Sequence, residues 1–228
     1  MGDRATACPT GQGRQRCLVP RVASIAEPPR FAENTVDADP LKQFAAWFKD
    51  AVAVGEILPE AMTIATSTRL GEPSARMVLL RGFDQRGFGF FTNYESQKGR
   101  ELAENPKAAL VVYWAKLGRQ VRISGEVVKQ SADESTAYFH ARPLASQISA
   151  LASPQSQVIP SRASLEDTVS ALAAKYEGAA VPLPPNWGGY RVIPQTIEFW
   201  IHRDNRLHDR IRYTRQPGGG WRIERLAP

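Results

Sequence analysis

The spacing of apolar residues changes near residue 39 and divides the chain into two parts. Residues 1–38 carry Gly, Pro, Arg and Thr without a regular period, which predicts a disordered leader. A transit peptide, a mis-assigned start or a plain flexible tail would each account for it. At Asp39 an N-cap residue precedes Pro40, and an apolar stripe at helical spacing then predicts a helix to about Val54. We therefore expect one folded domain over residues 39–228.

After this helix the chain consists mainly of short strand-like segments. They are rich in β-branched and aromatic residues and are separated by Gly, Pro and Asn turns. They cover residues 62–67, 75–82, 87–94, 108–114, 120–129, 189–193, 196–201, 210–214 and 221–225. Three helices are expected to begin at Ser96, at the capping box of Ser131 and Glu134, and at Ser164. Many antiparallel strands with a few peripheral helices predict an α+β domain built on an antiparallel β-barrel.

Composition narrows the function classes. The 228 residues carry a formal net charge of +6, which favours anionic partners. Basic residues are interleaved with acidic ones and form no nucleic-acid-binding signature, so we expect no binding to nucleic acid. No apolar run approaches the roughly 20 residues of a membrane helix, so we expect no membrane association. Two cysteines and three histidines without metal-ligand spacing predict a cytoplasmic protein that lacks a disulfide framework and a metal site.

A first candidate anion site lies at the junction of a predicted strand and a predicted helix. It runs from Phe91 and Thr92 to Lys98 and combines hydroxyl groups, amides and a cation. Free backbone N–H groups at a helix N-terminus favour a bound anion. No glycine-rich dinucleotide motif or P-loop occurs, so a mononucleotide phosphate fits this segment best.

A second candidate comprises Tyr138, Arg142 and Ser146, which are spaced by four residues around Pro143. Tyr138 and Arg142 share one helix face, so their hydroxyl and guanidinium groups would form a phosphate cradle with the serine. A surface helix end with a capping serine is the alternative interpretation of the same residues. Between these two segments in the sequence, the amide of Gln120 could hydrogen-bond a planar heterocycle.

The C-terminal segment concentrates further cations around a histidine. On an extended strand Arg206, His208 and Arg210 would project from one face, because side chains alternate along a strand. Cations so close together repel one another unless an anion or an electron-rich ring lies among them. The segment therefore predicts a pocket for a phosphorylated or aromatic ligand, with a solvated edge strand as the alternative.

Nine short motifs follow one another in a fixed order between Pro40 and Pro228. They are residues 76–81, 91–93, 119–121, 138–139 with 142–143, 146–148, 155–156, 187–189, 198–200 and 206–210. In this order, and with these gaps, the chain resembles the pyridoxine 5′-phosphate oxidase (pyridoxamine 5′-phosphate oxidase) family. The resemblance implies an FMN-binding split β-barrel and a homodimer with FMN at the subunit interface. It also implies oxidation of pyridoxine 5′-phosphate or pyridoxamine 5′-phosphate to pyridoxal 5′-phosphate, with O₂ reduced to H₂O₂.

The same resemblance assigns roles to individual residues. Arg76 and Lys98 would hold the FMN phosphate, joined by Gln155 and Ser156 from the other subunit. The implied FMN contacts are Arg76, Met77, Val78, Leu79, Leu80, Arg81, Phe91, Thr92, Gln97, Lys98, Gln120, Gln155, Ser156, Trp200 and Arg210. The implied substrate contacts are Arg81, Tyr138, Arg142, Ser146, Arg206, Leu207 and His208. Arg206 and His208 would be catalytic residues facing the pyridine ring, while the hydride chemistry would belong to the flavin.

Several positions depart from the family pattern. Arg81 replaces a usual lysine, Gln97 a common cation and Gly118 a usual glutamate, while His202 lies where a glycine is usual. The Arg-rich segment that covers the substrate in the family is not recognisable. These departures predict a more open site and slower turnover of pyridoxine 5′-phosphate. The alternatives are a related FMN-dependent oxidoreductase acting on another aromatic substrate, and a non-enzymatic protein that stores flavin or pyridoxal phosphate.

Overall fold

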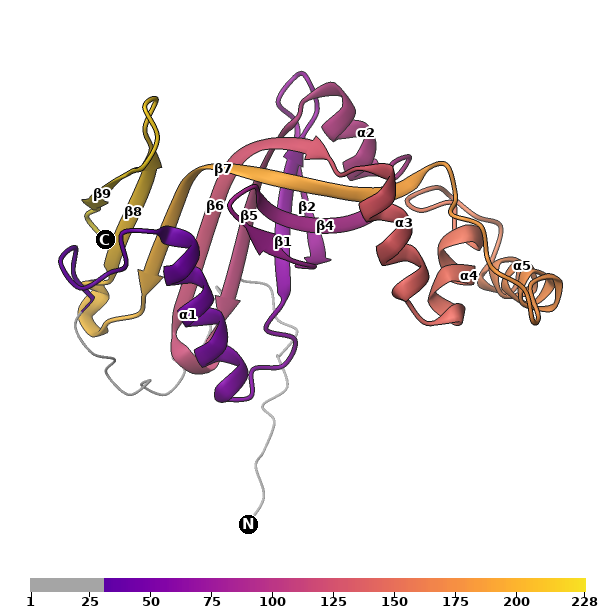
Figure 1. Ribbon diagram of the computed structural model, residues 1–228, viewed down its shortest axis with the longest axis horizontal. Coiled ribbons are helices and arrows are strands. Elements are labelled where there is room, and N and C mark those ends of the chain that lie inside the picture. Colours follow the sequence, from indigo (N-terminus) through magenta and orange to yellow (C-terminus); the bar gives the residue numbers. More distant parts are fainter. Residues whose placement is uncertain (1–30) are drawn as a thin grey trace, which may run out of the picture.

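The computed structural model describes residues 31–228, which form a curved antiparallel sheet flanked by helices (Figure 1). Strands pair in the order β2-β1-β5-β6-β7-β4-β3, and β8 joins β7 to β9. Their bounds are β1 (Ala61–Ser67), β2 (Pro73–Leu79), β3 (Phe83–Asp84), β4 (Gly87–Asn93), β5 (Lys107–Trp114), β6 (Arg119–Lys129), β7 (Trp187–Ile201), β8 (Asp209–Arg215) and β9 (Trp221–Arg225). The expected α+β class and antiparallel sheet are confirmed.

Helices cover the ends and one side of this sheet. They are α1 (Pro40–Ala53), α2 (Gln97–Glu104), α3 (Ala132–Ala141), α4 (Leu144–Ala152) and α5 (Arg162–Lys175), with 3₁₀ turns η1 (Ala115–Leu117) and η2 (Asp204–Arg206). Helix α1 begins at the predicted cap, where the Asp39 side chain accepts a hydrogen bond from Leu41 N. Its Phe44 is fully buried and makes an edge contact with Phe88, at 5.0 Å between ring centroids. No helix in the described residues is long and apolar enough to cross a membrane.

Strand β7 connects the two halves of the sheet. The sequence predicted two strands, 189–193 and 196–201, but the structure has one strand of 15 residues. Its first half pairs with β4, its second half pairs with β8, and β6 follows both halves. The register between β6 and β7 shifts at Gly125, where a Cβ atom would lie 1.9 Å from Ile193 O. This shift accommodates Pro194, which has no N–H to donate, so the strand bends without ending.

Residues 31–38 pack against the folded domain, whereas the sequence predicted that they belong to a disordered leader. Phe31 is 8% exposed and its ring lies 5.1 Å from that of Trp47 on α1. Two C-terminal side chains hold the same segment, because Tyr213 donates to Asp37 O and Arg225 pairs with Glu33. The predicted boundary at residue 38 is therefore too late by at least eight residues, while the prediction for residues 1–30 lies outside the described residues.

The predicted helix starts were confirmed for some helices and not for others, because more than one residue can act as a cap. The capping box of Ser131 and Glu134 is present at the start of α3, as expected. Helix α5 begins earlier than predicted, because Ser161 rather than Ser164 is its cap and Ser164 completes the box. Helix α4 was not predicted. It packs Ile148 into a small second core with Phe139 and Trp187, a contact that the sequence does not show.

Candidate functional site

A cleft of about 820 Å³ lies between β2, β4, the first turn of α2 and the bend between α3 and α4. Most of the residues that were assigned to FMN or to the substrate phosphate line it. These are Arg76, Met77, Val78, Leu79, Arg81, Phe91, Thr92, Lys98, Tyr138, Arg142, Ser146, Gln155 and Ser156. Its size lies within the range of pockets that enclose a cofactor-sized ligand, roughly 300–1,000 Å³.

Lys98 forms the centre of one end of the cleft. Ser96 caps α2, which places Lys98 in the first helical turn beside β4. The ammonium group lies 3.1 Å from Thr92 Oγ1, 3.1 Å from Ser96 Oγ and 3.0 Å from Gln155 Oε1. Burial, and then the charge of Arg76, lower the pKa of Lys98 to about 8. A buried cation whose direct hydrogen-bond acceptors are all neutral favours an anionic ligand at this end.

Arg76 lies beside Lys98 and is fixed from below by a buried network. Its guanidinium group donates to Thr66 Oγ1 and to Ser74 Oγ, and its Nη2 lies 3.4 Å from Glu101 Oε2. Antiparallel pairing positions these groups, because Arg76 opposes Ile64 and Ser74 opposes Thr66 across β1 and β2. Glu101 reaches the network from α2 and was not identified from the sequence. Its position four residues after Gln97 on a helix was the only available signal.

Arg142 forms the second cationic centre of the cleft. Its Nη2 donates to Ser146 O at 2.8 Å, and its guanidinium carbon lies 4.9 Å from the Trp187 ring centroid. Its Nη1 is buried and has no hydrogen-bond partner among the described residues. Burial lowers the pKa of Arg142, although the arginine remains charged at any physiological pH. A buried guanidinium nitrogen without an acceptor is costly unless a ligand supplies one.

Aromatic rings line the wall between β4 and α3. Tyr138 stacks on Phe91 with ring centroids 3.9 Å apart and an interplanar angle of 16°. Phe91 in turn stacks on Trp187 at 5.6 Å. The prediction that Tyr138 and Arg142 share one helix face is wrong, because α3 ends at Ala141 and Arg142 has an extended backbone, but both side chains line the cleft with Ser146. The bend at Pro143 brings the three residues together, as the spacing indicated.

Three other predicted flavin contacts lie outside the cleft. Gln120, Trp200 and Arg210 are cross-strand neighbours on β6, β7 and β8. Arg210 Nε donates to Glu198 Oε1 at 2.8 Å, which holds its guanidinium group against the sheet. Figure 1 shows β8 and β9 at one end of the molecule and α3 to α5 at the other. Within a single chain, these three residues do not meet the cleft.

The segment with Arg206 is not an extended strand, so the prediction that Arg206, His208 and Arg210 share one strand face is wrong. Arg206 lies in η2, is exposed and has a positive φ of 63°, and β8 begins only at Asp209. Leu207 is 71% exposed. The physical reason is the turn itself, because residues 204–206 form a 3₁₀ turn that reverses the chain between β7 and β8.

His208 lies in a small cluster of rings beside Trp200. Its ring centroid is 4.6 Å from that of Trp200 and 5.2 Å from that of His202, which the site prediction did not include. Its Nδ1 accepts a hydrogen bond from Arg203 N at 3.1 Å, so a neutral ring carries its proton on Nε2. Burial, then His202 and Arg206, lower the pKa of His208. The ring is therefore a neutral donor at pH 7.

Three further assignments need correction. Leu80 is 6% exposed and packs in the main core, so it does not line the cleft. Gln97 is exposed and donates to Glu101 at 2.9 Å, so its side chain turns away from the cleft. Gln155 and Ser156 line the cleft of their own chain, whereas they were expected from the other subunit. The unpredicted helix α4 is the reason, because it returns the chain to β4.

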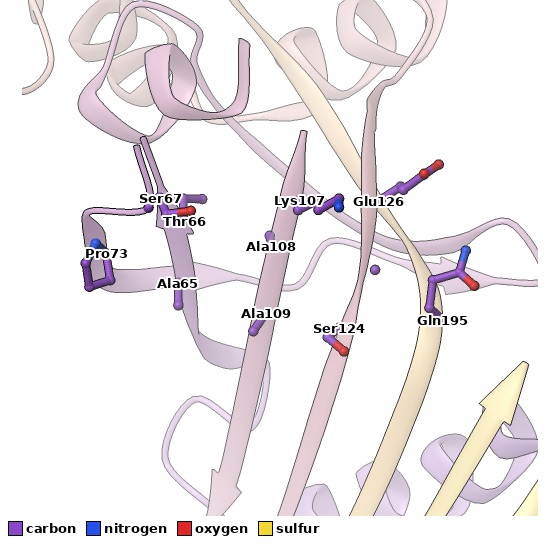
Figure 2. A pocket seen from close by; sticks show the side chains of 12 residues that line it. Ala65, Thr66, Ser67, Pro73, Lys107, Ala108, Ala109, Ser124, Glu126 and Gln195 are labelled. Atoms are coloured by element: carbon purple, nitrogen blue, oxygen red, sulfur yellow. The ribbon is translucent and has the colours of Figure 1, made fainter. Parts of the chain in front are cut away.

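A second hollow of about 660 Å³ lies on the outer face of the sheet (Figure 2). Small side chains create it, since Ala65, Ala109 and Ser124 are neighbours across β1, β5 and β6. Its charged residues Lys107 and Glu126 oppose one another in the strand register and offset each other's charge. None of the predicted site residues lines this hollow. In the described part of the chain no three His, Cys, Asp or Glu side chains are arranged to hold a metal ion.

Comparison with known proteins bears on both parts of this arrangement. Residues 48–176 match the family profile described as pyridoxamine 5′-phosphate oxidase. Residues 187–228 match the profile described as pyridoxine 5′-phosphate oxidase C-terminal dimerisation region. The cleft thus falls mostly within the first match, while Trp200, Arg206 and Arg210 fall within the second.

Curated relatives and solved structures agree with these matches. A pyridoxine/pyridoxamine 5′-phosphate oxidase of Paraburkholderia phymatum is 56% identical over 195 residues, which cover 86% of this chain and 92% of the relative. One of Trichormus variabilis is 55% identical over 198 residues, covering 87% and 92%.

Two solved structures share the fold. PhzG from Burkholderia lata 383, in complex with tetrahydrophenazine-1-carboxylic acid, has a TM-score of 0.83 at 32% identity and covers 90% of this chain and 100% of that one. A pyridoxamine 5′-phosphate oxidase-related, FMN-binding protein from Nostoc punctiforme has a TM-score of 0.65 at 19% identity, covers 83% and 98%, and shows the fold alone. These likenesses confirm the expected split barrel, and the chain belongs to the pyridoxamine 5′-phosphate oxidase family.

Proposed function

We propose that the cleft binds FMN, with the phosphate between Arg76 and Lys98 and the flavin along β2. The arrangement of Lys98 carries this proposal, because a buried ammonium group beside a second cation is stabilised by a phosphate. Met77, Val78 and Leu79 line the same cleft and offer an apolar edge for a planar ring. Thr92 and Gln155 already contact Lys98 and complete a polar cradle that accepts and donates hydrogen bonds.

The substrate phosphate occupies the other cationic centre, near Arg81 and Arg142. Arg76 and Arg81 are five residues apart, which separates their Cα atoms by roughly 16 Å along an extended chain. One phosphate cannot bridge this distance, so the cleft suits two anionic groups. Buried Nη1 of Arg142 lacks a protein acceptor, and Ser146 lies beside it on α4. A phosphorylated pyridine would supply the acceptor and stack near Tyr138.

The protein acts as a homodimer in which the other subunit completes each cleft. Gln120, Trp200 and Arg210 form a row on the sheet, far from the cleft of their own chain, and Arg206 and His208 follow at the same end. Residues 187–228 match a dimerisation region, which supports placing this end against the other subunit. A two-fold axis would then bring each row to the opposite cleft and form two equal sites.

The reaction converts the C4′ alcohol or amine of the substrate to an aldehyde. FMN, held by Arg76 and Lys98 at its phosphate, would supply the redox chemistry, a two-electron oxidation at C4′ with O₂ as the final acceptor and H₂O₂ as its product. Arg206 and His208 orient the pyridine ring so that C4′ lies against the flavin, which is a contribution of proximity and charge. For pyridoxamine 5′-phosphate the product is an imine, and water hydrolyses it to pyridoxal 5′-phosphate and ammonia.

A second candidate function is oxidation of a phosphate-free aromatic compound. The likeness to PhzG, whose structure contains tetrahydrophenazine-1-carboxylic acid, favours it. The joint presence of Tyr138, Arg142 and Ser146 in the cleft favours the phosphorylated substrate instead, because an uncharged group would leave Arg142 buried without an acceptor.

Two departures from the family pattern bear on the rate of this reaction. Arg81 replaces a lysine, and the family's substrate-covering segment is not recognisable in this sequence, so we expect efficient FMN binding but slow turnover. A kcat/KM of roughly 10⁴ M⁻¹s⁻¹ or more would contradict slow turnover.

Anaerobic titration of the purified, flavin-loaded protein with pyridoxine 5′-phosphate tests the proposal. We expect the visible flavin absorption to bleach and to return when air is admitted, with one equivalent of H₂O₂ per bleached flavin. A protein that keeps its colour with this substrate and bleaches with a reduced phenazine precursor would favour the second function. A protein that cannot be reconstituted with FMN would contradict both.

A further inference from the structure

Glu101 is a buried carboxylate that the proposed chemistry does not use. It is 6% exposed and lies on the side of α2 that faces β1 and β2. It accepts hydrogen bonds from Thr66 and Ser74 hydroxyls and from Gln97 Nε2, and Arg76 Nη2 lies 3.4 Å away. A buried charge is costly to fold unless several donors stabilise it, so its presence indicates a function other than packing.

The network determines how Arg76 presents itself to the cleft. Nη1 and Nη2 contact Thr66, Ser74 and Glu101, and the guanidinium plane is held by these contacts on the protein side. Nε makes no bond within the described residues and keeps its hydrogen for an anion in the cleft. Because rotamer freedom is removed before the ligand arrives, less entropy is lost when a phosphate binds.

The carboxylate also acts on Lys98, one helical turn away from it on α2. Two charged groups flank the ammonium: Arg76 on β2 disfavours its protonated form, and Glu101 favours it. The other neighbours of Lys98 are neutral, namely Thr92 on β4, Ser96 at the cap of α2, and Gln155 after α4. Without Glu101, burial and Arg76 would act on Lys98 unopposed, and the phosphate end would lose a positive charge near neutral pH.

We propose that Glu101 is a positioning residue for the FMN phosphate: it fixes the guanidinium group of Arg76 from below, one helical turn from Lys98. This inference rests on the proposed FMN site and deepens it. A carboxylate close to a phosphate site would by itself repel the phosphate. Here it lies behind Arg76 within a set of four donors, and the proposal requires that the gain from ordering Arg76 exceed the repulsion.

The test compares binding of FMN with binding of riboflavin, which lacks the phosphate, by the whole protein and its E101Q variant. Glutamine keeps the shape and the acceptor oxygen and removes the charge. We expect the Kd for FMN at pH 7.5 to rise about tenfold, as for the loss of one charge-assisted hydrogen bond. The Kd for riboflavin should stay within about twofold, because no ring contact changes. E104Q, which changes an exposed glutamate on the same helix, is the matched control and should change neither Kd.

The pH dependence of the Kd for FMN is a second measurement. It would not change if Glu101 served only in packing. In E101Q the pH above which FMN binding weakens should be lower than in the wild type by about one unit, since the lysine loses its stabilising charge. An unchanged or lower Kd for FMN in E101Q, with the wild type still preferring FMN over riboflavin, would overturn the role of Glu101 alone. A wild type without that preference would overturn the FMN site itself. If E101Q does not fold, S74A is the second variant, with an expected rise of about threefold.

Discussion

The cleft and the C-terminal end of the sheet hold their proposed ligand-binding residues in different ways. In the cleft, Lys98 and Arg142 are largely buried and each is fixed by contacts from two or more elements. At the C-terminal end, Arg206 lies exposed on a 3₁₀ turn with a left-handed backbone, and Trp200 is only half-buried on the sheet. The first arrangement is formed within one chain, while the second presents exposed side chains on the outside of the sheet.

This difference agrees with the proposal that the two halves of the site come from two subunits. Burying a cation is unfavourable, so the cleft offsets that cost with hydroxyl groups, amides and Glu101 in its own chain. Arg206 has no such shell, and an exposed side chain does not orient a substrate well until a partner restricts it. The predictions that follow test this division, from the largest expected effect to the smallest.

Subunit mixing separates the two halves most strongly. Arg76→Ala alone should release FMN, and Arg206→Ala alone should keep FMN but lose turnover by roughly 100-fold or more. A purified heterodimer of the two variants should regain about half of the wild-type activity, because one of its two symmetric sites is then intact. Coexpression with two affinity tags and a coupled H₂O₂ assay provides the measurement.

The matched control for this mixing reverses the outcome. A heterodimer of wild type with the Arg76→Ala/Arg206→Ala double variant has one defect in each site and should be almost inactive. If instead the control is half active and the first heterodimer inactive, each site takes both residues from one chain, and the comparison above is broken.

Loss of Arg142 should weaken substrate binding without releasing the cofactor. Arg142→Ala removes the buried cation of the second centre, so we expect KM for pyridoxine 5′-phosphate to rise by roughly 30- to 100-fold. The FMN content should stay at the wild-type level, because Arg76 and Lys98 are unchanged. Arg162→Ala, at an exposed arginine of α5, is the control and should leave KM unaltered. A matching loss of FMN would show that the two cationic centres are one site.

The pH dependence of FMN binding should follow Lys98. Its pKa of about 8 means that the ammonium loses its proton above that pH, so the Kd for FMN should rise by up to about tenfold per pH unit. The sign is opposite for stability of the free protein. Between about 8 and the usual 10.5 the unfolded chain holds a proton that the folded one has released, so the destabilising contribution of this lysine declines as pH rises.

Fluorescence titration from pH 7 to 9.5 with FMN, with riboflavin in parallel, measures this effect. Lys98→Ala should bind FMN more weakly and should lose the dependence on pH. If the variant keeps the wild-type pH profile, another group controls binding and the cleft is organised differently.

The smallest effect concerns the segment that ties the C-terminal strands to α1. Tyr213→Phe removes the hydrogen bond from the buried hydroxyl to Asp37 O, so the free energy of unfolding should fall by about 1 kcal/mol. FMN binding should stay unchanged, because Tyr213 is fully buried in the core and does not line the cleft. Urea denaturation with a parallel FMN titration checks both expectations. An equal loss of FMN affinity would mean that the two regions are coupled through the core.

Local sequence signals predicted most of the elements and part of the site. Asp39 and Ser131 mark helix starts because a capping side chain acts on backbone groups two or three residues away. The cluster of Tyr138, Arg142 and Ser146 was predicted for the same reason, since its spacing needs only one helix and one bend. Helix α5 shows the limit, because Ser161 and Ser164 are both competent caps and only the packing of the chain selects between them.

Long-range pairing decided what local signals missed. Pro194 indicated a break, yet β7 continues because Gly125 on β6 allows a shift in register. Glu101 was not identified from the sequence, because its burial depends on the packing of α2 against β1 and β2. The turn at Arg206 defeated the strand prediction because alternating cations are compatible with both a strand and a tight reversal.

Residue types and their period were enough to predict the candidate ligand-binding groups and most elements in order, because these signals act over a few residues. The sequence indicated the cations of both centres, the caps of α1, α2 and α3, and most strands of the sheet. The tertiary structure decided which of these residues meet. Strand pairing joins Arg76 to Thr66 and Glu101, and α4 returns Gln155 to Lys98 in the same chain. It also separates Trp200 and Arg210 from the cleft, because one curved sheet holds the two sets of residues at its opposite ends.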